Sequence, residues 1–141
     1  MKAIILCGGL GTRLSKVLNN VPKAMAPINK TPFLSLLIKY LSKYKINEII
    51  LAVGYKHQVI KNFYGDSFKD VKISYSYEEK ALGTGGALNN AFDLISDDKA
   101  LILNGDTFFN INLNRFLQLD SPKKDVLVAT KKINGSSRYN F

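Results

Sequence analysis

A glycine-rich segment that ends in an arginine is the first feature of this chain suited to binding an anion. The segment reads GGLGTRL and directly follows an apolar run. Its glycines, Gly8, Gly9 and Gly11, would let backbone N–H groups approach a phosphate closely. A helix beginning near Thr12 would add further donors, and Arg13 would supply a planar, permanently charged fork for phosphate oxygens. The pattern favours a phosphate-binding loop over a plain strand–helix turn with a surface arginine.

Two familiar phosphate motifs do not account for this segment. The dinucleotide-binding fingerprint needs a third glycine where Leu14 stands, and it needs an acidic residue about 20 positions further on, which is missing here. The P-loop ends in Gly-Lys-Ser/Thr, whereas this segment ends in Thr-Arg-Leu. The sequence therefore disfavours both of these sites.

A lysine follows a proline at Pro22-Lys23. Because proline fixes the backbone just before it, Lys23 would be held over the same anion instead of swinging freely. On the dipeptide alone, an ordinary loop lysine is the favoured interpretation.

A second glycine cluster, LGTGGA at residues 82–87, lies between a predicted strand and a predicted helix. Its glycines, together with Thr84, would allow close approach to a base or ribose. Tight packing of the helix against the strand is an equally open alternative.

Asn104-Gly105-Asp106 follows a continuous apolar run. A carboxylate at the end of a buried strand is well placed to hold Mg²⁺ that bridges phosphate oxygens. Asn-Gly is also a strong hairpin signal, but hairpin strands usually alternate in polarity and this run does not.

Apolar runs alternate with helical patterns along the whole chain. We expect strands at residues 3–7, 48–53, 72–77, 100–103 and 125–130, and helices from Thr31-Pro32, at 57–64, at 85–95 and at 113–119. Thr31 would be the N-cap of its helix and Pro32 its first residue. The order predicts an α/β fold, a Rossmann-like three-layer α/β/α sandwich with a mostly parallel sheet. Ligands of such sheets bind at the carboxyl ends of the strands.

Composition narrows the class of protein. The formal net charge is +9, of which residues 1–70 carry +8, so an anionic partner is expected. No apolar stretch reaches the roughly 20 residues of a membrane span, and the aromatic residues do not interleave a basic patch as in nucleic-acid readers.

The single cysteine, Cys7, is expected to be a small buried hydrophobe, and the protein is expected to be cytoplasmic. His57 lacks a catalytic partner at a useful spacing.

Taken together, GGLGTRL, Pro22-Lys23, LGTGGA and Asn104-Gly105-Asp106 resemble the sugar-phosphate nucleotidyltransferase family, across essentially the whole chain. Heptose 1-phosphate guanylyltransferases are the most similar members, ahead of mannose 1-phosphate guanylyltransferases and the uridylyltransferases. The resemblance implies transfer from a nucleoside triphosphate, with GTP favoured over UTP, CTP and dTTP, to a sugar 1-phosphate, with release of pyrophosphate. It also implies Mg²⁺ as cofactor and a role in making lipopolysaccharide, capsule or S-layer glycans. Neither nucleic acid nor a membrane is an expected partner, and a homo-oligomer is possible for this family.

The resemblance also implies a role for each motif residue. Arg13, Lys23 and Asp106 would be catalytic, and Asp106 would bind the metal. Glu78, Asn104 and Gly105 would contact substrate. The nucleotide would be bound by Leu6, Gly8, Gly9, Gly11, Thr12, Arg13, Lys23, Gly83 and Thr84.

The family pattern continues beyond position 141 with a Glu-Lys pair and a second metal-binding aspartate. We therefore expect one domain over residues 1–141 that is the N-terminal nucleotide-binding portion of a longer catalytic domain and is a weak or inactive catalyst alone. A non-catalytic nucleotide-binding fragment and a nicotinamide-dependent oxidoreductase remain as alternatives.

Overall fold

The structure, a computed structural model, describes residues 1–9, 21–119, 126–130 and 132. Contacts between residues divide the chain into two compact units, Met1–Phe109 and Asn110–Phe141, which are described separately.

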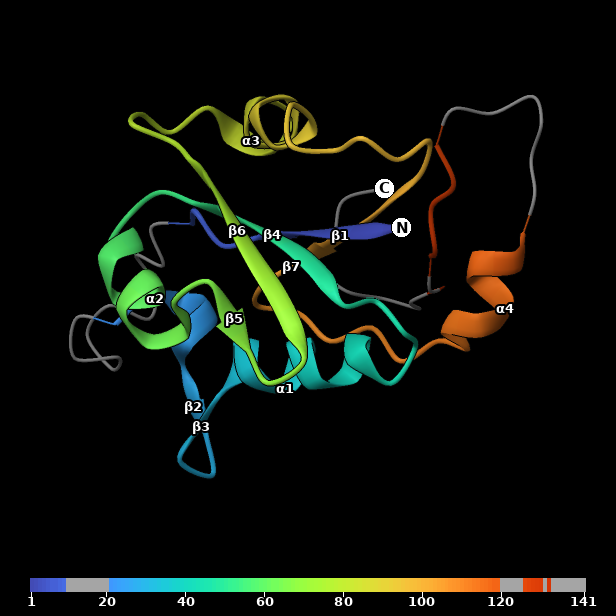
Figure 1. The fold of residues 1–141 in the computed structure, drawn as a ribbon, viewed down its shortest axis with the longest axis horizontal. Helices are drawn as coiled ribbons and strands as arrows, with labels where there is room; N and C mark the ends of the chain where they lie inside the picture. Colours follow the sequence, from blue (N-terminus) through green and yellow to red (C-terminus); the bar gives the residue numbers. More distant parts are fainter. Residues whose placement is uncertain (10–20, 120–125, 131, 133–141) are drawn as a thin grey trace. The chain divides into compact units, whose positions relative to one another are not determined.

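A five-stranded sheet organises the first unit (Figure 1). Its order is β5-β6-β4-β1-β7, and all neighbours are parallel except β5 and β6. The strands are β1 (Lys2–Leu6), β4 (Glu48–Val53), β5 (Ser67–Phe68), β6 (Val71–Tyr77) and β7 (Ala100–Asn104). The predicted mostly parallel sheet is confirmed, and the four predicted strands within this unit shift by one residue at most at either end.

Helices cover both faces of this sheet (Figure 1). On one face α3 (Gly83–Phe92) packs through Ala87 and Ala91 on Ile4 and Ile50. On the opposite face lies α1 (Phe33–Ser42), which buries five residues. The third helix, α2 (His57–Tyr64), has its predicted bounds and ends at Gly65, and its Tyr64 hydroxyl is 2.7 Å from Ser35 Oγ on α1. Central strands β1 and β4 are therefore buried on both sides, as their continuous apolar runs predict.

The predicted start of α1 is wrong. Thr31 and Pro32 form strand β3 (Thr31–Pro32), which pairs with β2 (Pro27–Ile28), and the helix begins at Phe33 without a side-chain cap. The first helical N–H is satisfied instead by a backbone acceptor, because Phe33 N donates to Ala26 O at 2.9 Å. A two-residue ladder has replaced the expected threonine cap.

The second predicted helix boundary also differs. Helix α3 covers residues 83–92 instead of 85–95, and turns continue the chain past it, with Ile95 N donating to Phe92 O at 2.9 Å. Phe92, the last residue of α3, is 46% exposed. The two buried alanines bring α3 close to the sheet, and the larger ring lies outside that contact.

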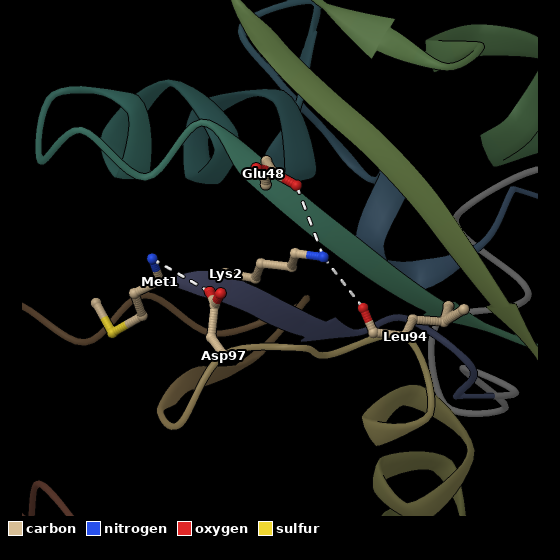
Figure 2. Close-up of polar contacts among 5 residues, drawn as sticks. All are labelled: Met1, Lys2, Glu48, Leu94 and Asp97. Carbon is tan, nitrogen blue, oxygen red and sulfur yellow. Dashed lines mark hydrogen bonds and ion pairs between the residues drawn. The ribbon is translucent and has the colours of Figure 1, made fainter.

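Charged groups tie together the amino ends of β1 and β4 and the chain that follows α3 (Figure 2). Lys2 Nζ donates to Leu94 O at 3.2 Å and lies 3.7 Å from Glu48 Oε2. Met1 N lies 3.2 Å from Asp97 Oδ2. These contacts fix the approach from α3 to β7, and so help to set β7 beside β1.

The second unit contains α4 (Leu113–Gln118), close to its predicted bounds. Asn112 caps this helix, because its Oδ1 accepts from Arg115 N at 3.0 Å. The strand predicted at 125–130 is wrong for its described residues: residues 126–130 have no regular structure, and Val126 and Val128 are 71% and 70% exposed. A strand needs a neighbour to pair with, and the described part of this unit contains none. No helix among the described residues of the chain is long and apolar enough to cross a membrane.

Candidate functional site

The direction in which successive strands are added to the sheet reverses at β1. Strands β4 and β6 lie on one side of β1, and β7, the next strand of the sheet in the sequence, lies on its other side. In open parallel sheets such a reversal leaves a crevice at the carboxyl ends of the strands. A cleft of about 350 Å³ lies there, within the range of small-molecule sites. It is lined by Leu6, Cys7, Gly8, Gly9, Lys23, Ala24, Glu78, Ala81, Gly83, Thr84, Ala87, Asn104, Gly105 and Asp106.

One wall of the cleft is the chain that leaves β1. Cys7 N donates to Ala52 O at 2.7 Å, which continues the pairing with β4 by one residue. Gly8 and Gly9 follow at the surface of the cleft. The thiol of Cys7 is buried, and burial, together with the nearby charge of Asp106, raises its pKa far above the ordinary value. Cys7 is therefore a buried apolar residue, as expected, and not a nucleophile.

The chain that leaves β7 forms the adjoining wall. Gly105 N donates to Leu6 O at 2.9 Å, which brings this chain directly against the end of β1. A Cβ at Gly105 would lie 2.8 Å from both Leu6 O and Cys7 Sγ, so the close approach requires glycine. Residues 105–112 contain no strand that turns back. The hairpin alternative for Asn104-Gly105 is therefore excluded.

Lys23 and Asp106 meet across the cleft. Lys23 begins a short 3₁₀ helix, η1 (Lys23–Met25), whose Ala24 and Met25 are buried, so the lysine stands on an anchored turn after Pro22. Its Nζ donates to Asp106 Oδ2. Partial burial raises the pKa of Asp106, but hydrogen bonds from Lys23 and Thr107 and the lysine charge outweigh it, so the pKa lies below its usual value. Asp106 is ionised at neutral pH.

The far wall combines Glu78 with the start of α3. Glu78 follows β6, and its backbone N donates to Val53 O at 2.8 Å. Its Oε2 accepts from Leu82 N at 3.2 Å, and its Oε1 faces Gly8, where a Cβ would lie 2.6 Å away. Gly83 and Thr84 form the first turn of α3, which has no side-chain cap. The free N–H groups of that turn and the helix dipole favour a negatively charged or hydroxyl-bearing ligand.

Ten of the residues predicted from the sequence meet in this one cleft. They come from four separate stretches of chain: Leu6, Gly8 and Gly9; Lys23; Glu78, Gly83 and Thr84; and Asn104, Gly105 and Asp106. Gly11, Thr12 and Arg13, and the helix predicted near Thr12, lie outside the described residues.

The sequence did not indicate four other residues of the lining, Cys7, Ala24, Ala81 and Ala87. They are small side chains that shape the cleft and carry no charge. Their only signal in the sequence is their position next to the chemically distinctive residues.

Asp106 is the carboxylate best placed to hold a cation with a ligand in the cleft. Among the described residues, no group of three or more His, Cys, Asp or Glu side chains is arranged to hold a metal ion. One carboxylate matches a cation that brings most of its oxygen ligands with it, as Mg²⁺ does when it is bound to a polyphosphate.

Comparison with known proteins agrees with this geometry. The model of the family described as nucleotidyl transferase matches residues 2–140. The chain belongs to the nucleotidyl transferase family. The fold of this chain, with its cleft at the carboxyl ends of β1 and β7, is the α/β fold with a mostly parallel sheet that the sequence predicts.

Two curated relatives carry the same name, D-glycero-alpha-D-manno-heptose 1-phosphate guanylyltransferase. The protein of Campylobacter jejuni is 49% identical over 139 residues, and that of Aneurinibacillus thermoaerophilus is 42% identical over 140 residues. Each match covers 99% of this chain and 61% of the relative. The chain therefore spans about three fifths of the length of these two relatives.

A solved structure supports the fold independently. HddC from Yersinia pseudotuberculosis, crystallised with GMP-PN, superposes with a TM-score of 0.73 at 37% identity. The match covers 83% of this chain and 52% of HddC.

Proposed function

We propose that this chain binds GTP with Mg²⁺ in the cleft, as the nucleotide-binding part of an enzyme that joins GTP to a heptose 1-phosphate and releases pyrophosphate. The observation that carries the proposal is the meeting of Lys23 and Asp106 at the carboxyl ends of the strands, beside the exposed backbone of Gly8 and Gly9. A cation, a carboxylate and bare main-chain amides are the groups that a magnesium-bound triphosphate requires.

The phosphates would lie against Gly8, Gly9 and Lys23. Backbone N–H groups approach phosphate oxygens most closely where no side chain intervenes, and among the described residues no atom lies within 4 Å of a Cβ position at Gly9. Lys23 supplies a positive charge on an anchored turn. By the family resemblance, Gly11, Thr12 and Arg13 would complete the phosphate contacts.

Mg²⁺ would be held by Asp106 and the phosphate oxygens. The ion usually takes one or two protein carboxylates, substrate phosphates and water, and Asp106 provides one ionised carboxylate at the cleft. When bound, Mg²⁺ supplies neutralisation of phosphate charge. The donor set suits an ion that arrives with the nucleotide better than a permanent protein site.

The base would lie between Glu78 and the first turn of α3. An ionised carboxylate only accepts hydrogen bonds, and guanine offers adjacent N1–H and N2–H donors on its Watson–Crick edge. Uracil and thymine offer a single ring N–H there. Glu78 therefore supports guanine, in agreement with the names of the two heptose relatives and the ligand in the HddC crystal.

The transfer step needs alignment more than covalent chemistry. A phosphate oxygen of the sugar 1-phosphate would attack the α-phosphorus of GTP in line as pyrophosphate leaves. Because both reactants are anions, Lys23 and the backbone amides would act by neutralising charge and holding the two phosphates in line. The choice of heptose as the sugar rests on the names of the two relatives. Mannose as the alternative sugar and a role in surface glycans rest on the family resemblance alone.

Calorimetric titration of the 141-residue chain with GTP, UTP, CTP and dTTP in Mg²⁺ tests the proposal. GTP should bind most tightly, and Glu78→Gln should weaken GTP binding by about tenfold or more. Glu79→Gln, the same change at the next residue, should leave it unaltered. Absence of nucleotide binding would overturn the proposal, and equal affinity for all four nucleotides would overturn the assignment of guanine.

Turnover tests the choice of sugar. Pyrophosphate release from GTP should be faster with heptose 1-phosphate than with mannose 1-phosphate, measured on the chain alone and on a version extended to the length of the heptose relatives. The reverse preference would favour a mannose 1-phosphate guanylyltransferase.

A further inference from the structure

The two oxygens of the Asp106 carboxylate have different partners. Oδ2 accepts from the ammonium of Lys23, and Oδ1 accepts from the hydroxyl of the next residue, Thr107, at 3.0 Å. One partner is a cation from a distant part of the sequence and the other is a neutral group on the adjacent residue. The carboxylate is thus oriented from two sides.

These two partners would behave differently when a magnesium-bound triphosphate enters. Phosphate oxygens give Lys23 a new anionic partner, and Mg²⁺ can replace the ammonium at Oδ2 because both are positive charges that seek the same oxygen. The Thr107 hydroxyl carries no charge and donates to the other oxygen, Oδ1. Neither the phosphates nor Mg²⁺ therefore competes with this hydrogen bond. It would keep the carboxylate turned toward the cleft during the exchange.

The position of Thr107 is fixed by its neighbours. Gly105 is bonded to the end of β1 through Leu6 O, and Phe108 packs edge-on against Tyr40 of α1, with ring centroids 5.0 Å apart. The short stretch with Asp106 and Thr107 is therefore anchored on both sides. A β-branched threonine has few χ1 rotamers, so its hydroxyl has a well-defined direction.

We propose that Thr107 is a positioning residue for the metal ligand: its hydroxyl holds Asp106 Oδ1 so that Oδ2 is free to take Mg²⁺ when Lys23 turns to the phosphates. This inference rests on the proposed binding of Mg²⁺ and GTP. Groups that orient a metal-binding carboxylate typically contribute about 10- to 100-fold in metal affinity, and the exposed position of Thr107 suggests the lower value.

The test measures how much Mg²⁺ strengthens GTP binding, as the ratio of dissociation constants in EDTA and in saturating Mg²⁺, with a fluorescent GTP analogue. Thr107→Val, which keeps the shape but removes the hydroxyl, should lower this ratio by about tenfold and leave metal-free binding unchanged. Thr107→Ser should restore it. Thr31→Val, the same change on β3 away from the cleft, should have no effect.

A double variant separates positioning from a general loss of structure. If Thr107 acts through the carboxylate, Thr107→Val should cause no further loss in an Asp106→Asn background. A normal ratio in Thr107→Val, no rescue by Thr107→Ser, or additive losses in the double variant would overturn the inference while leaving GTP binding intact. A wild-type chain that binds GTP equally with and without Mg²⁺ would overturn the magnesium site and this inference together, and no GTP binding at all would overturn the proposed function.

Discussion

A lysine–carboxylate pair lies at each end of the sheet, and the two pairs have different surroundings. At the amino end Lys2 lies 3.7 Å from Glu48 and also donates to Leu94 O, so its ammonium joins three segments of the fold (Figure 2). At the carboxyl end Lys23 and Asp106 border a cleft with glycine backbone on two sides. Both pairs join a lysine to a carboxylate, and position on the parallel sheet decides which pair is available to a ligand.

The two pairs also differ in whether their removal should lower the stability of the fold or the affinity for a ligand. The Glu48 side chain is 52% exposed, and exposed ion pairs typically contribute about 0.2–1 kcal/mol to stability. Lys23 and Asp106 are similarly modest as a stabilising contact, but each becomes a charged contact to phosphate or metal in the proposed complex. The expected consequences are therefore in stability at the amino end and in binding at the carboxyl end.

The largest difference is expected between Lys23→Ala and Lys2→Ala. Hydrogen bonds to charged groups contribute about 1.5–3 kcal/mol, so Lys23→Ala should weaken binding of Mg²⁺·GTP by roughly 10- to 150-fold. Lys2→Ala should leave the affinity unchanged. Calorimetric titration of both variants measures this contrast. Equal effects of the two substitutions on affinity would contradict the claim that only the carboxyl end of the sheet binds the nucleotide.

A smaller effect is expected from the close packing beneath the cleft. Gly105→Ala places a methyl group 2.8 Å from Leu6 O, a backbone atom that cannot turn away, and should destabilise the fold by about 1–3 kcal/mol. A methyl group at Gly9 would meet no atom of the described part of the chain within 4 Å, so Gly9→Ala should change stability by less than about 0.5 kcal/mol. Urea unfolding of both variants checks the prediction. Equal stabilities would show that the β1–β7 contact is looser than described.

The smallest effect is expected from Glu48→Gln. Its exposed contact with Lys2 should contribute at most about 1 kcal/mol of unfolding free energy, and that contribution should shrink further in high salt. GTP affinity should equal that of the unaltered chain. A measurable loss of GTP binding in this variant would mean that the amino end takes part in the site.

Sequence patterns were sufficient for the central strands and, together with the family resemblance, for ten of the residues that line the cleft. Continuous apolar runs predict β1 and β4 because both faces of those strands are covered, and Gly65 marks the end of α2 by its backbone freedom. Asp106 is recognisable from its place after an apolar strand. Its contact with Lys23 is not, because the two residues are 83 positions apart and meet only once β7 lies beside β1.

Two of the wrong predictions, the start of α1 and the strand at 125–130, share one cause, which is dependence on a partner elsewhere in the chain. Thr31 and Pro32 would suit a helix start, but Pro27 and Ile28 offer a ladder and Ala26 offers a carbonyl to Phe33. The apolar run at 126–130 would suit a strand, but the described residues of its unit provide no neighbour. The local preference of a segment for helix is realised only where no tertiary partner competes for it. The local preference for strand is realised only where a neighbouring strand is present.

The central claim is that the carboxyl end of the sheet, and not its amino end, receives a metal-bound nucleotide. Titration of the isotope-labelled chain with Mn²⁺·GTP tests this by NMR, because the paramagnetic ion broadens amide signals near it and occupies the same kind of oxygen site as Mg²⁺. The amide signals of Gly8, Gly105 and Asp106 should broaden first, and those of Lys2 and Glu48 should stay sharp. Broadening that begins at the amino end, or that is equal at both ends, would contradict the account.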